Sequence, residues 1–131
     1  MPTDYTNGID EFTRFAEQGD PQAQFRLGVM YGLGLGVEQS YHSAIEWYQK
    51  SAQAGNPRAQ CNLGWMYGTG RGVPQNFVSA LAWYSIAAAA GDEVARSNRD
   101  ILNLRMTPYQ VERSQAMAQD LVQDFAARDN E

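Results

Sequence analysis

The chain has 131 residues, 44% of them hydrophobic, and its 15 acidic residues exceed its 10 basic residues to give a formal net charge of −5. This length and composition are typical of one globular domain, so we expect residues 1–131 to form a single unit. The acidic balance disfavours sequence-independent nucleic-acid binding, which needs clustered basic residues, and no apolar run is long enough to span a membrane.

The N-terminal residues lack the basic and apolar regions of a secretory signal, and Cys61 is the only cysteine. An intrachain disulfide is therefore impossible, which fits a reducing compartment. From these features we expect a cytoplasmic protein with no membrane and no nucleic acid among its partners.

The first predicted element is a helix over residues 9–18, in which Ile9, Phe12, Phe15 and Ala16 recur at helical spacing. This helix has the pattern of the second helix of an incomplete repeat. We therefore expect residues 1–19 to cap the N-terminal end of a stacked array.

Residues 16–51 then recur as residues 52–87, shifted by 36 positions without a gap. Identical residues occupy 18 of the 36 pairs, which are 16/52, 19/55, 21/57, 23/59, 24/60, 27/63, 28/64, 30/66, 31/67, 32/68, 34/70, 36/72, 37/73, 39/75, 43/79, 44/80, 47/83 and 48/84. A fixed period of this length predicts a stacked array in which each unit buries its apolar face against its neighbours.

Each copy is predicted to be two helices joined by a glycine-rich turn, which gives repeats over residues 20–55 and 56–91. Their first helices start at Asp20-Pro21 and Asn56-Pro57, because Asp or Asn caps a free N–H and proline needs no donor at the first helical position. The later signals are Ser40 and Asn76 as caps of the second helices and Gly55 and Gly91 as their ends.

The turns over residues 32–37 and 68–73 carry glycine at every second position. We expect all three glycines of each turn to stop the preceding helix and to supply positive φ. A phosphate-binding loop is the less favoured interpretation, because the GxGxxG spacing and the preceding strand of a dinucleotide site are both missing.

Residues 92–131 depart from the pattern and are predicted to form a degenerate repeat followed by a C-terminal capping helix. Thr107, Pro108 and Gln110 have the spacing of a capping box, and we expect the helix that follows to cover the open end of the stack. The complete prediction is an all-α protein of about seven helices and no strand, arranged as an α-solenoid of antiparallel helix pairs in a short right-handed superhelix.

The run from Ala59 to Asn76, continuing through Ala80 to Trp83-Tyr84, resembles a Sel1-like repeat, a 36-residue relative of the tetratricopeptide family. Residues 23–55 match the same pattern. The resemblance implies a non-enzymatic α-solenoid adaptor whose concave face binds an unidentified protein or peptide. The paired cysteines of some secreted family members are missing here, so nothing specific to that branch applies.

Positions that differ between the two copies are the candidates for ligand contact, because repeated aromatic residues are better explained by packing than as a stacking platform. On the first helix of each copy, the differing residues beside the core stripe are Gln22, Phe25, Arg26, Val29 and Leu33, and Arg58, Cys61, Asn62, Trp65 and Thr69. Our predicted binding residues are Phe25, Arg26, Val29, Arg58, Cys61, Asn62 and Trp65.

Trp65 is the foremost of these candidates, since tryptophan is favoured at interface hot spots. The alternative for Trp65 is that it fills space beneath the terminal helices. Arg26, Arg58 and Asn62 could bond a peptide backbone or a carboxylate. Cys61 takes the place of Phe25 in the other copy, which indicates a packing position that faces the groove.

An enzyme is the least favoured class of function. His42 is the only histidine, so a histidine-based metal cluster is excluded, and Cys61 could in principle act as a nucleophile partnered by His42. We expect no catalytic residue, no metal and no cofactor. The remaining alternative to an adaptor is a structural module that self-associates, so we expect a monomer or a weak homo-oligomer.

Overall fold

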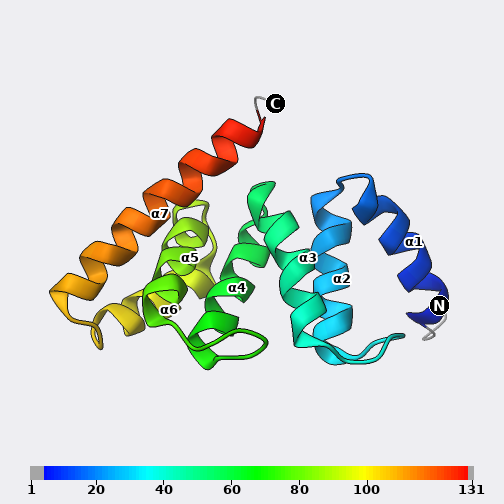
Figure 1. Ribbon diagram of the computed structural model, residues 1–131, viewed down its shortest axis with the longest axis horizontal. Coiled ribbons are helices and arrows are strands. Elements are labelled where there is room, and N and C mark those ends of the chain that lie inside the picture. The colour runs from blue at the N-terminus through cyan, green and yellow to red at the C-terminus, as the bar shows by residue number, and fades with distance from the viewer. Residues whose placement is uncertain (1–4, 130–131) are drawn as a thin grey trace.

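The computed structural model describes residues 5–129, and these residues form seven α-helices and no strand (Figure 1). The helices are α1 (Tyr5–Glu17), α2 (Pro21–Leu33), α3 (Tyr41–Gln53), α4 (Pro57–Thr69), α5 (Phe77–Ala89), α6 (Glu93–Asn103) and α7 (Pro108–Asp129). The predicted all-α class and helix count are confirmed. No helix within the described range is long and apolar enough to cross a membrane.

Antiparallel pairs form the array: α2 packs along α3 and α4 along α5, with α1 against α2 and α6 against α5 (Figure 1). The predicted start signals are confirmed. The Asp20 side chain accepts a hydrogen bond from the Gln22 N–H at 3.0 Å, and Asn56 Oδ1 accepts one from Arg58 N at 3.0 Å. Ser40 and Asn76 cap α3 and α5 in the same way.

The glycine turns are only partly as predicted. Gly34 and Gly70 end α2 and α4 with φ of 71° and 73°, in the left-handed region that glycine enters at little cost. Gly32 and Gly68 instead remain inside the helices, so the prediction that they stop α2 and α4 is wrong. A Cβ on Gly32 would lie 3.8 Å from the Ala44 Cβ of the paired helix, an ordinary contact distance.

A close approach between a glycine and a tyrosine ring holds each helix pair together. A Cβ on Gly64 would lie 2.7 Å from Tyr84 Cδ1, which is too close for real atoms, and a Cβ on Gly28 would overlap the Tyr48 ring. Beside these contacts Leu63 is fully buried. Glycine is therefore required at both positions because the ring occupies the space of a side chain.

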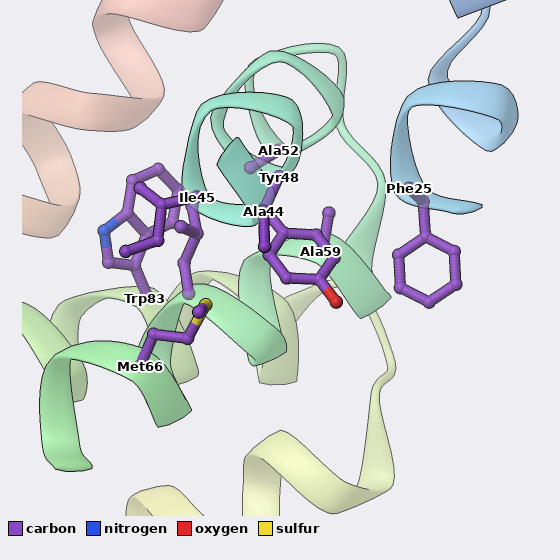
Figure 2. Packing of buried hydrophobic residues seen from close by; sticks show 9 residues of the cluster. Phe25, Ala44, Ile45, Tyr48, Ala52, Ala59, Met66 and Trp83 are labelled. Carbon is purple, nitrogen blue, oxygen red and sulfur yellow. The ribbon is translucent and has the colours of Figure 1, made fainter. Parts of the chain in front are cut away.

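Neighbouring units are joined by buried polar and apolar contacts. Gln60 Nε2 donates to the Ala52 carbonyl oxygen at 3.1 Å, and Gln24 makes the equivalent bond one unit earlier. Figure 2 shows Tyr48 between Phe25 and Trp83 in the core cluster that spans α2 to α5. The turn after α4 also approaches α3 closely, since a Cβ on Gly72 would lie 3.0 Å from the Tyr41 carbonyl carbon.

The C-terminal helix starts as predicted and packs along the last full repeat. Thr107 N–H donates to Gln110 Oε1 at 2.9 Å and Gln110 N–H donates to Thr107 Oγ1 at 3.2 Å, which confirms the capping box. Beyond it, α7 packs along α5, with Phe125 stacked on Trp83 at 5.9 Å between ring centroids. Since α7 lies along α5 and reaches α3, Val94 of α6 and Leu104 just after α6 remain exposed at this end of the array.

Candidate functional site

Three adjoining pockets follow the helices α2, α4 and α6, and we name them the junction pockets. The first pocket is lined by Phe12, Gln22, Phe25, Arg26, Val29, Met30, Leu35 and Arg58. The central pocket has a volume of about 400 Å³ and is lined by Val29, Gly32, Leu33, Tyr41, Tyr48, Asn62, Trp65, Met66 and Arg71. The third is lined by Trp65, Gly68, Thr69, Phe77, Tyr84, Asn98, Ile101, Leu102 and Arg105.

The junction pockets are one structural feature repeated along the array. Eight lining positions of the central and third pockets are related by 36 residues, at 29/65, 32/68, 33/69, 41/77, 48/84, 62/98, 65/101 and 66/102. Val29 lines both the first and the central pocket, and Trp65 both the central and the third, so the three pockets adjoin in series; we call the surface that they form the groove.

The central pocket has an aromatic wall that carries a positive charge. The Arg71 guanidinium carbon lies 4.9 Å from the Trp65 ring centroid and 5.7 Å from that of Tyr41. Arg71 Nη1 also donates to the Tyr41 hydroxyl at 2.9 Å. These contacts hold the guanidinium in place by cation–π attraction and one hydrogen bond, so its remaining N–H groups are available to a ligand.

Buried tyrosines line the central and third pockets at equivalent positions. Burial raises the pKa of Tyr48, and a hydrogen bond with the Asn62 side chain opposes that shift. Burial likewise raises the pKa of Tyr84 to about 12, with the Asn98 side chain opposing it. Both hydroxyls are therefore neutral at physiological pH, and the two tyrosines contribute packing and hydrogen bonds rather than charge.

The first pocket places two arginines on aromatic rings. The Arg58 guanidinium carbon lies 5.0 Å from the Phe25 centroid, and that of Arg26 lies 5.8 Å from the Phe12 centroid. Phe25 is itself buried, so it supports Arg58 and presents little surface of its own. The arginine side chains are exposed and form the polar edge of an apolar hollow.

Cys61 lies in the core, so the prediction that it faces the groove is wrong. It is 7% exposed, packs with Ala80, Tyr84, Ala87 and Ala95, and lines none of the junction pockets. Burial, reinforced by the negative charge of Asp92, raises the pKa of its thiol to about 11. The thiol is therefore protonated at neutral pH and is a poor nucleophile.

The structure brings the other predicted binding residues to the groove. Asn62 and Trp65 line the central pocket, Phe25, Arg26 and Arg58 the first, and Val29 both. Trp65 is 43% exposed and lines the third pocket together with Ile101 and Leu102 of α6, so it is only partly covered at the terminal helices.

Sequence reasoning missed lining residues outside the first helix of each copy. Tyr41 begins α3 and Arg71 lies in the turn after α4, and both differ from their 36-residue equivalents, Phe77 and Leu35. The comparison of mismatched positions would have found them if it had included the turns and second helices. Residues of α6 gave no such signal, because the repeat pattern is lost there.

Stacked helix pairs with the same pocket at successive junctions define an α-solenoid repeat protein. The family model described as Sel1 repeat matches residues 21–56 and 57–92. The chain therefore belongs to the Sel1 repeat family.

Solved structures show the same fold. A protective antigen of uropathogenic Escherichia coli strains, described as displaying an SLR fold, superposes with a TM-score of 0.91 at 28% identity over 97% of this chain and 28% of the antigen chain. A Sel1 repeat protein from Oxalobacter formigenes gives a TM-score of 0.75 at 34% identity over 79% of this chain and 42% of its own. The chain thus spans less than half of either neighbour. No curated protein matches in sequence.

Proposed function

We propose that this chain is a non-enzymatic adaptor that binds a peptide segment of a partner protein in the groove formed by the three junction pockets. The observation that carries the proposal is the position of Trp65, which is 43% exposed and forms a wall of both the central and the third pocket. Large aromatic side chains at the centre of a contact surface supply much of the binding energy in protein interfaces.

The low reactivity of the one cysteine supports a binding role over a catalytic one. The Cys61 thiol is buried and protonated at neutral pH, and His42 lies on the exposed face of α3, 3.0 Å from Glu46. A cysteine nucleophile needs an accessible thiolate and a nearby base.

A displayed library of random dodecapeptides tests the proposal. We expect wild-type protein to enrich a set of related peptides and Trp65→Ala to recover at least about tenfold less of that set, because hot-spot truncation costs about 2 kcal/mol. Tyr109→Ala is the matched control, since Tyr109 is an exposed aromatic residue on α7 outside the groove. Equal recovery by wild type and Trp65→Ala would rule out groove binding.

Self-association is a second candidate, and the exposed apolar side chains of α6 favour it. Val94 of α6 is 64% exposed, and Leu104, which directly follows α6, is 89% exposed. We expect such a surface to give a concentration-dependent dimer in light scattering. A monomer whose mass is independent of concentration would exclude this function.

A further inference from the structure

The groove has the opposite charge to the chain. Arginines line all three junction pockets, namely Arg26, Arg58, Arg71 and Arg105. Among residues 5–129 no aspartate or glutamate lines any of them, although the chain carries 15 acidic residues against 10 basic ones. The groove is therefore a strip of positive charge on an acidic protein.

None of these four arginines has a carboxylate partner among the described residues. The ion pairs found there join Arg96 to Glu93 and Arg99 to Asp100, and both lie outside the groove. Three of the four arginines lie against aromatic rings instead, at Phe12, at Phe25, and at Tyr41 with Trp65. A guanidinium that rests on a ring keeps its N–H edge free and loses less entropy when an anion binds.

We propose that the groove selects an acidic peptide segment, with aspartate or glutamate side chains paired to these arginines and an apolar side chain in the central pocket. This rests on the proposed function. Arginine can bind a carboxylate through two parallel N–H donors, which fixes geometry as well as charge. Val29, Trp65 and Met66 give the central pocket the apolar surface for an anchoring side chain.

A peptide fits this surface better than a nucleic acid does. A nucleic acid carries a phosphate at every residue, and binding it depends on a local excess of basic groups that displaces its counterions. Four arginines on a chain of net charge −5 supply a limited excess. An acidic peptide needs only a few carboxylates, spaced to meet the arginines. Unlike a nucleic acid, it does not bring a further charge with every residue.

The peptide library separates this proposal from the proposed function. We expect the enriched dodecapeptides to be about twofold or more richer in Asp and Glu than the input library. Enrichment that depends on Trp65 but shows no acidic bias overturns the acidic preference and leaves groove binding intact. If no peptide is enriched, or none depends on Trp65, both proposals fail. Labelled oligothymidylate is measured alongside the peptides. If it binds more tightly than the best peptide, the choice of a peptide over a nucleic acid as the ligand is overturned.

Charge reversal tests the arginines individually. We expect Arg58→Glu and Arg71→Glu each to lower the affinity for the best acidic peptide about tenfold, as measured by fluorescence anisotropy, because each creates a like-charge contact. Arg113→Glu is the matched control, since Arg113 also lies over a ring, that of Tyr109 at 6.0 Å, but outside the groove. Thermal unfolding checks that the variants are folded. An equal loss in Arg113→Glu, or no loss in both groove variants, overturns the proposal.

Discussion

The interior of the helix pairs and the junction pockets both recur every 36 residues, yet they differ in how strictly the sequence recurs. In the interior, glycine and tyrosine are the same in both units, at Gly28 and Gly64 against Tyr48 and Tyr84. In the pockets, Val29 is replaced by Trp65 and Leu35 by Arg71. A close-packed interior accepts little change in volume, whereas an open hollow accepts many side chains. Residues that are identical in the two units therefore indicate close packing, and residues that differ indicate positions where packing does not restrict the side chain.

One position qualifies this contrast. Phe25 and Cys61 differ between the units, yet both are buried. Phe25 packs on Tyr48 with ring centroids 6.0 Å apart, while Cys61 packs in a cluster with Ala95 of α6. The surroundings are equivalent, since Tyr48 and Ala59 beside Phe25 correspond to Tyr84 and Ala95 beside Cys61. A difference between copies therefore indicates a binding position only when the side chain is also exposed.

The largest effect should come from breaking the interior. We expect Gly28→Ala to lower the free energy of unfolding by about 1–3 kcal/mol, because the added Cβ meets the Tyr48 ring and the helices must separate. Chemical denaturation monitored by circular dichroism measures the loss.

Gly32→Ala is the control for Gly28→Ala. Its Cβ would lie 3.8 Å from the Ala44 Cβ, so it fits without displacement. Alanine in a helix interior is favoured over glycine, and we expect unchanged stability or a gain of up to about 1 kcal/mol. Equal losses in the two variants would show that the tyrosine contact does not set the spacing of the pair.

A smaller effect should appear at the buried Cys61 at alkaline pH. Its folded pKa is raised from 9.0 to about 11, so the folded state favours the neutral thiol. The stability linked to this thiol is complete below about pH 9 and is lost as pH rises through about 11, a contribution on the order of 1 kcal/mol. We expect denaturant midpoints measured between about pH 8 and about pH 10.5 to fall less steeply for Cys61→Ala than for wild type. If the denaturant midpoints of Cys61→Ala and wild type fall equally steeply with pH, this linkage is contradicted.

The smallest effect on stability should come from the groove. Trp65→Val installs the residue that the first unit carries at this position, and we expect the unfolding free energy to change by less than about 0.5 kcal/mol. A loss comparable to that of Gly28→Ala would show that Trp65 is a packing residue, and the contrast between interior and groove would be lost.

Much of the fold could be predicted from the sequence because its signals are local. Asp20, Asn56 and the Thr107–Gln110 box start helices through contacts within one turn, which a linear pattern displays. Gly32 was misassigned because it lies in the last turn of α2, where a linear pattern does not distinguish a glycine inside the helix from Gly34, which ends it. The placement of α7 depends on stacking between Phe125 and Trp83, which are far apart in the chain.

The groove could be predicted only in part for the same reason. Arg26, Arg58 and Trp65 lie on the first helices, where the differences between copies are easily compared. Arg71 reaches the central pocket only because the turn after α4 folds back onto α3. Each pocket combines residues of different units, so its composition follows from how the units stack rather than from one repeat.

That stacking gives Gly72 a long-range effect. Its turn rests against Tyr41 so closely that any side chain would push the second unit away from the first. Since the units are stacked in series, a small change in the angle between the first and second repeats would rotate α4 to α7 together. The distance between the first and third pockets would then change. A residue without a side chain thus sets the distance between the first and third pockets.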